Sequence, residues 1–119
     1  MKSICVYCGS NAGSKPIYAE RAAALGERIA QEGLRLVYGG GNVGLMGVVA
    51  NAVLQADGQV TGVIPKQLAD WEVAHRGLTE LEIVGSMHER KSRMFELSDG
   101  FVTLPGGFGT MEEIFEMLT

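Results

Sequence analysis

The chain has 119 residues, of which 46% are hydrophobic and 20% charged, so it can form one globular domain and is not a disordered chain. Its formal net charge of −4 argues against nucleic acid as a partner, because a nucleic-acid groove needs a basic face. No apolar run approaches the roughly 18 residues of a membrane helix, and the N-terminus lacks a signal-peptide pattern, so we expect a cytoplasmic protein without a membrane partner.

Short apolar segments alternate with helical patterns along the chain. The apolar segments predict strands at 3–7, 34–38, 59–64, 81–84 and 101–104. The periodic segments predict helices at 16–32, 44–56, 87–97 and 110–118. Segment 65–79 fits either a short helix or an irregular loop. The alternation predicts an α/β fold with a doubly wound, Rossmann-like parallel sheet, in which ligands bind at the carboxyl ends of the strands.

Residues typical of helix ends stand at the borders of these segments. Gly33 is expected to stop the first helix, and Asp57 is most simply a turn residue after the second. Ser86 and Glu89 have the spacing of a capping box at the start of the helix at 87–97.

Cys5 and Cys8 form a C-x-x-C pattern, which could indicate a redox pair or half of a zinc site. Three positions apart along a strand, however, the two side chains point to opposite faces. His75 and His88 stand alone in the sequence, so no second ligand pair completes a metal site. We therefore expect no metal, and interpret the cysteines as small apolar residues.

The chain holds 17 glycines, gathered in clusters, and one cluster follows the last predicted strand. This cluster has the sequence Pro105-Gly106-Gly107-Phe108-Gly109-Thr110 and is called the second glycine loop, because another glycine loop precedes it in the chain, at residues 39–44. Its backbone N–H groups and the helix dipole behind it favour a phosphate. Glu113 completes a capping-box pattern with Thr110, but it could also stabilise the cationic sugar of a glycosidic cleavage and activate water. Spacing alone leaves both roles open.

The first glycine loop, residues 39–44, formally matches the dinucleotide motif G-x-G-x-x-G. It follows the second strand, and no acid ends the next strand to bind a ribose, which argues against an NAD-dependent oxidoreductase. Gly40 and Gly41 are better interpreted as a floor under a mononucleotide, with plain turn chemistry as the alternative. Ser10, after the first strand, could bind phosphate or ribose or simply close a turn.

Arg90 and Lys91 lie in the first turns of the helix at 87–97, where cations oppose the helix dipole. A local anion would explain their position. The alternative is an exposed charged face on which Glu89 pairs with Arg93 at i,i+4.

Three motifs occur in the order and spacing of one protein family. They are Gly-Gly-Gly-Asn-Val-Gly-Leu-Met-Gly at 39–47, Met-His-x-Arg-Lys at 87–91 and Pro-Gly-Gly-x-Gly-Thr-x-x-Glu at 105–113. The chain thereby resembles the Lonely Guy family over essentially its whole length. The resemblance implies a phosphoribohydrolase that cleaves cytokinin riboside 5′-monophosphates or adenosine 5′-monophosphate (AMP) to free base and ribose 5-phosphate. Relatives were once labelled lysine decarboxylases, but no pattern here fits pyridoxal phosphate, and no cofactor is expected.

The resemblance also implies roles for individual residues. Arg90 and Glu113 match the catalytic pair of the family. The substrate-binding positions that match are Ser10, Gly40, Gly41, Glu72, Met87, Lys91, the loop Gly106, Gly107, Phe108, Gly109 and Thr110, and finally Thr119.

Family members are longer and have active sites close to a dimer interface, so the resemblance implies a homodimer. The apolar stripe of the last predicted helix stops at Thr119 without a cap, and we interpret residues 1–119 as the N-terminal part of a longer domain, truncated at its C-terminus. The competing function is a nucleotide- or phosphate-binding module that does not hydrolyse its ligand.

Overall fold

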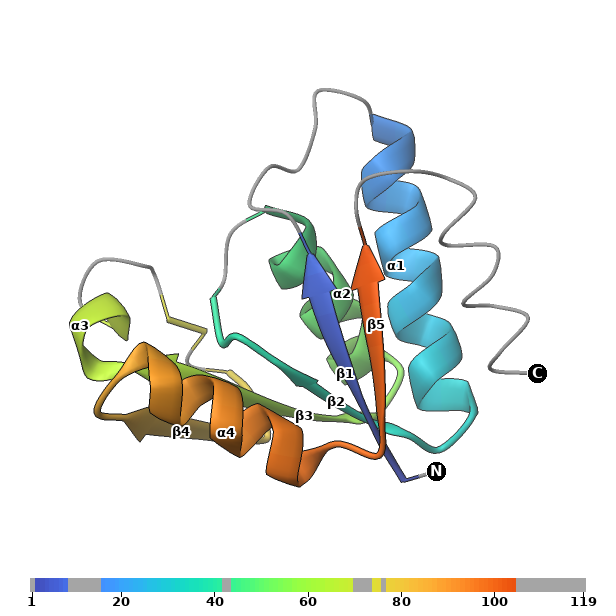
Figure 1. Ribbon diagram of the computed structural model, residues 1–119. Coiled ribbons are helices and arrows are strands. Elements are labelled where there is room, and N and C mark those ends of the chain that lie inside the picture. Colours follow the sequence, from blue (N-terminus) through green and yellow to red (C-terminus); the bar gives the residue numbers. More distant parts are fainter. Residues whose placement is uncertain (1, 9–15, 42–43, 70–73, 76, 105–119) are drawn as a thin grey trace.

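A five-stranded parallel sheet forms the centre of the molecule (Figure 1). The computed structural model describes residues 2–8, 16–41, 44–69, 74–75 and 77–104. The strands are β1 (Ser3–Cys8), β2 (Arg35–Tyr38), β3 (Gln59–Pro65), β4 (Glu80–Val84) and β5 (Gly100–Leu104), in the spatial order β4-β3-β2-β1-β5. The strand order reverses between β1 and β5, which is the ligand-binding arrangement of doubly wound sheets.

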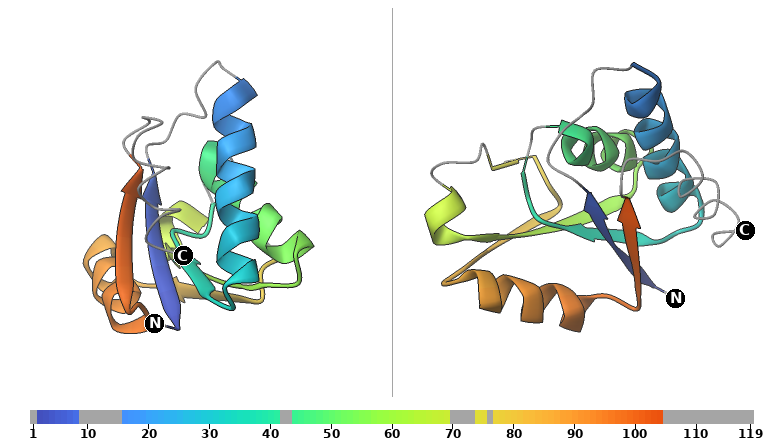
Figure 2. Two further views of the ribbon diagram at one scale, coloured as in Figure 1. Left: turned by 90° about the vertical axis from the view of Figure 1, so that its right-hand side faces the viewer. Right: turned by 45° about the horizontal axis from the view of Figure 1, so that its top comes forward.

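Helices cover both faces of the sheet, as the two views in Figure 2 show. They are α1 (Pro16–Gln31), α2 (Gly44–Gln55), α3 (Lys66–Ala69) and α4 (Met87–Leu97). α1 and α2 pack against each other on one face, where Leu25, Ile29 and Val49 are fully buried against the strands. α4 lies on the other face and buries Met94 against β1, β2 and β3. Burying both faces makes the central strands apolar over most of their length.

The predicted architecture is confirmed. Each predicted strand is present with bounds that differ by at most one residue, and α4 has the predicted bounds. Gly33 and Asp57, both with positive φ, follow the ends of α1 and α2. The ambiguous segment contains a short helix, α3, and the helix predicted at 110–118 lies outside the described residues. Among the described helices, none combines the length and apolar character needed to cross a membrane.

Asp99 ties the start of β1 to the start of β5. Its Oδ2 accepts the backbone N–H groups of Lys2 at 2.9 Å and Ser3 at 3.0 Å, and its own N–H donates to the Ser3 carbonyl at 2.9 Å. The bonds from Lys2 and Ser3 lower the pKa of the Asp99 carboxyl below its ordinary value. The charged carboxylate is therefore favoured in the folded state.

The Asp99 contacts make stability depend on pH. A lowered folded-state pKa stabilises the fold above the unfolded aspartate pKa of about 3.9, and this contribution is lost as the pH falls through the folded value. We expect Asp99→Asn to lower the Tm at neutral pH and the difference from wild type to shrink below about pH 4. Thermal unfolding followed by circular dichroism across this range measures it. A Tm difference that stays constant with pH would contradict the account.

Candidate functional site

Arg90 extends from the first turn of α4 across the sheet towards β2 and β3. Its Nε donates to the Val63 carbonyl at 2.9 Å and one Nη donates to the Gly39 carbonyl at 2.5 Å. The other Nη lies 3.7 Å from the Met87 sulfur. Two carbonyls thus fix the planar guanidinium while it keeps donors for another acceptor. The side chain is half-buried, so the interpretation of Arg90 as part of an exposed charged face is wrong.

Gly39 makes room for this arginine. A Cβ on Gly39 would collide with the Arg90 Nη that donates to the Gly39 carbonyl. Gly40, the next residue, has φ +82°, a conformation that side chains other than glycine rarely adopt. With Arg90 in this position no side chain fits at residue 39, and the backbone conformation at residue 40 favours glycine.

Three consecutive carbonyls of the first glycine loop are each held by a different partner. The Gly39 carbonyl accepts from Arg90, the Gly40 carbonyl from the backbone N–H of His75 at 2.9 Å, and the Gly41 carbonyl from the Tyr38 hydroxyl at 2.8 Å. Tyr38 is fully buried, and burial raises the pKa of its phenol, so the hydroxyl keeps the proton that it donates. Gly39, Gly40 and Gly41 are thus fixed where β2 ends.

His75 is buried to 8% exposure beside this loop. Its Nδ1 accepts the backbone N–H of Gly77 at 3.1 Å, which leaves Nε2 as the protonated nitrogen, 2.6 Å from the Asn51 Oδ1. Ala74, the residue before His75, forms an isolated antiparallel bridge with Gly41. These contacts carry no local sequence signal, because Asn51 lies 24 positions away and belongs to α2, and from the sequence His75 is interpreted only as a lone histidine without metal-ligand partners.

The remaining predicted residues on α4 lie at its surface. Lys91 is exposed, and Met87 is 53% exposed beside the Arg90 guanidinium. The alternative in which Glu89 pairs with Arg93 is wrong. Arg93 pairs with Glu82 on β4 at 3.0 Å and with Glu96 at 3.3 Å, because its side chain points towards the sheet edge.

Glu89 has a different role at the start of α4. Its Oε2 accepts the Gly85 N–H at 2.8 Å, while the Ser86 Oγ accepts the Glu89 N–H at 3.1 Å. This reciprocal arrangement is the predicted capping of the helix, with the returned bond placed one residue earlier than in the usual capping box.

Part of the predicted site falls outside the described part of the chain. Those outside the described residues are Ser10, Glu72, Gly106, Gly107, Phe108, Gly109, Thr110, Glu113 and Thr119. Within the described residues, the Arg90 guanidinium lies beside Met87 and the start of the first glycine loop, which contains Gly40 and Gly41. Lys91, the next residue of α4, is exposed.

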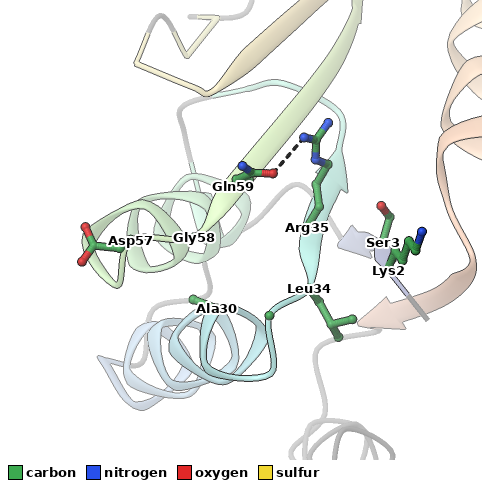
Figure 3. A pocket seen from close by; sticks show the side chains of 9 residues that line it. Lys2, Ser3, Ala30, Leu34, Arg35, Asp57, Gly58 and Gln59 are labelled. Atoms are coloured by element: carbon green, nitrogen blue, oxygen red, sulfur yellow. Dashed lines mark hydrogen bonds between the residues drawn. The ribbon is translucent and has the colours of Figure 1, made fainter.

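A cavity of about 570 Å³ lies at the amino ends of the strands, away from the carboxyl ends where Arg90 meets Gly39 (Figure 3). It is lined by the amino ends of the strands, including Ser3, Arg35 and Gln59, and by the turns that follow α1 and α2. Arg35 donates to the Gln59 carboxamide at 2.8 Å within this cavity. None of the predicted site residues lines it, so the cavity is separate from the group formed by Arg90, Met87 and the start of the first glycine loop.

Solved structures with the same fold include two molybdenum cofactor proteins. The carrier protein from Chlamydomonas reinhardtii matches with a TM-score of 0.73 and 22% identity, covering 98% of this chain and 71% of that one. The molybdenum cofactor binding protein from Rippkaea orientalis matches with a TM-score of 0.73 and 26% identity, covering 95% of this chain and 68% of that one. These likenesses support the doubly wound fold.

Relatives with higher identity carry one functional name. A cytokinin riboside 5′-monophosphate phosphoribohydrolase from Rhodococcoides fascians is 54% identical over 119 residues, which are 99% of this chain and 60% of that protein. A probable enzyme of the same name from Oryza sativa subsp. japonica is 51% identical over 116 residues, 98% of this chain and 52% of that protein. A relative of that name from Arabidopsis thaliana is 48% identical over 118 residues, 99% of this chain and 54% of that protein.

The chain therefore spans between half and two thirds of the length of these relatives. The family model described as "Possible lysine decarboxylase" matches residues 46–119, which include the second and third motifs of the sequence analysis. On these matches, the chain belongs to the family described as possible lysine decarboxylase, which includes the Lonely Guy phosphoribohydrolases that its motifs resemble.

Proposed function

We propose that this protein hydrolyses the N-glycosidic bond of nucleoside 5′-monophosphates, with AMP and cytokinin riboside monophosphates as substrates. The observation that carries the proposal is the Arg90 guanidinium, which Val63 and Gly39 fix at the carboxyl edge of the sheet beside the first glycine loop. A cation held in this way, with donors to spare, suits an anionic nucleotide. The names of the relatives support the same reaction.

In the proposed mechanism, the second glycine loop binds the 5′-phosphate through its backbone N–H groups. Arg90 orients the phosphate or the ribose. As the bond between C1′ and the base nitrogen breaks, its electron pair leaves with the base and the ribose becomes an oxocarbenium-like cation. Glu113 stabilises this cation and takes a proton from the attacking water, whose oxygen bonds to C1′. The departing base gains a proton from solvent, Glu113 returns its proton to solvent, and the products are free base and ribose 5-phosphate.

The other predicted site residues contact the nucleotide in this proposal. The first glycine loop provides its floor through Gly40 and Gly41, and Met87 and Lys91 border it from α4. Ser10, Glu72 and Thr119 complete the proposed binding positions. No metal or cofactor takes part in the proposed reaction.

The test is incubation of the purified protein with AMP and with isopentenyladenosine monophosphate, followed by chromatography of the bases. We expect adenine and isopentenyladenine to be released. Tight nucleotide binding by calorimetry without any free base would instead favour a binding module. Lysine with added pyridoxal phosphate is the control reaction, and carbon dioxide release from it would contradict the proposal.

The homodimer and the cytoplasmic location expected from the sequence stay predictions. One feature favours association: Phe95 on α4 is 69% exposed and stacks on Phe101 of β5, which is 42% exposed, with ring centroids 5.4 Å apart. Exposed paired aromatic rings are typical of surfaces that another element covers.

A further inference from the structure

A chain of hydrogen bonds links α2 to the first glycine loop through one buried imidazole. The Asn51 Oδ1 lies 2.6 Å from the His75 Nε2, and the His75 N–H donates to the Gly40 carbonyl at 2.9 Å. The Gly77 N–H donates to the other ring nitrogen at 3.1 Å. Both ring nitrogens of His75 therefore have partners, and the ring has one orientation that satisfies them.

These hydrogen bonds lie next to the backbone that binds Arg90. His75 holds the Gly40 carbonyl, and the adjacent Gly39 carbonyl accepts from the Arg90 guanidinium. Gly40 packs tightly as well, since a Cβ added to it would lie 3.2 Å from the Leu81 side chain. A shift of His75 would move the backbone that anchors Arg90.

We propose that Asn51 and His75 are positioning residues for nucleotide binding. Asn51 fixes the His75 ring, and His75 fixes the first glycine loop at Gly40, so that the loop and Arg90 meet the substrate in one arrangement. This inference rests on the proposed function, since it assigns a role to side chains that support the same site. Neither Asn51 nor His75 is among the site residues that the resemblance implies.

The hydrogen-bonding chemistry of Asn51 sets the key prediction. His75 donates through Nε2, so residue 51 must offer an acceptor at that point. Asn51→Asp keeps an acceptor oxygen at the same distance along the side chain. Asn51→Leu keeps the size but removes the acceptor, and leaves the buried Nε2–H of His75 without its partner. Because Asn51 belongs to the exposed residues of α2, leucine causes no cavity there.

The experiment compares the two variants with wild type in steady-state hydrolysis of AMP at about pH 8, above the ordinary histidine pKa of about 6.5. We expect Asn51→Leu to raise KM about tenfold with kcat changed less than about threefold, which is the pattern of lost binding. Asn51→Asp should stay within about threefold of wild type in both constants. Gln55→Leu, one turn further along α2 and also exposed, is the matched control and should equal wild type.

A second readout is independent of activity. Amide hydrogen exchange of His75 reports its bond to the Gly40 carbonyl, and we expect faster exchange in Asn51→Leu than in wild type or Asn51→Asp. An unchanged KM in Asn51→Leu would overturn the inference. A fall in kcat at constant KM would overturn it as well, because that pattern reports fewer folded molecules and not weaker binding. If wild type releases no base, the proposed function fails, and equal His75 exchange in all variants then overturns the positioning role separately.

Discussion

Replacing Glu113 by glutamine is expected to lower kcat for base release by about 10²–10⁴-fold while leaving nucleotide affinity nearly unchanged. Glutamine has the same size but carries no charge to stabilise the ribosyl cation and cannot take a proton from water. The loss should therefore fall on the chemical step. Single-turnover base release together with a calorimetric titration of AMP separates the two effects.

The same substitution distinguishes the two roles that the sequence left open for Glu113. A capping box accepts glutamine in place of glutamate, so a residue that only caps the last predicted helix would lose little on this change. Glu112→Gln removes the same charge one position earlier and is the matched control, expected to keep activity. Wild-type turnover in Glu113→Gln would show that the carboxylate is not catalytic.

Replacing Arg90 by lysine is expected to lower kcat/KM about 10²-fold or more, although the positive charge is kept. An ammonium group carries all its donors on one nitrogen, so it cannot reach the Val63 and Gly39 carbonyls at the same time as the planar guanidinium does. The charge would no longer be fixed at the place where the nucleotide is proposed to bind. Steady-state kinetics with AMP measures the effect.

Two further variants separate position from charge at this point. Gly39→Ala leaves Arg90 in the chain but puts a methyl group where its guanidinium lies, and we expect a loss of kcat/KM in the same direction. Arg93→Lys changes the other arginine of α4, which pairs with Glu82, and should leave activity unchanged. Activity within about threefold of wild type in Arg90→Lys would contradict the role given to the guanidinium.

The layered fold could be predicted from the sequence because its signals are local. Strands buried on both faces are apolar over most of their length, and helix ends carry residues with special backbone conformations, such as Gly33 and Asp57. β4 illustrates the limit of the apolar signal. It is an edge strand of sequence Glu-Leu-Glu-Ile-Val, and its Ile83 is 52% exposed although isoleucine is usually buried.

The geometry of the candidate site depends on contacts between distant segments. Arg90 could be placed in the first turn of a helix, but its bond to Gly39 joins residues 51 positions apart. The spacing on the helix allowed Arg93 to pair with Glu89, one of the two alternatives left open, whereas it pairs with Glu82 on β4. No local periodicity indicates the pairing of His75 with Asn51. Such contacts follow from strand order and tertiary packing.

The central claim, hydrolysis of the N-glycosidic bond, is tested most directly by following AMP with the wild-type protein in proton and phosphorus NMR. We predict that adenine and ribose 5-phosphate appear in equal amounts, with the phosphate still esterified. Formation of adenosine and inorganic phosphate, or AMP that stays unchanged, would contradict it.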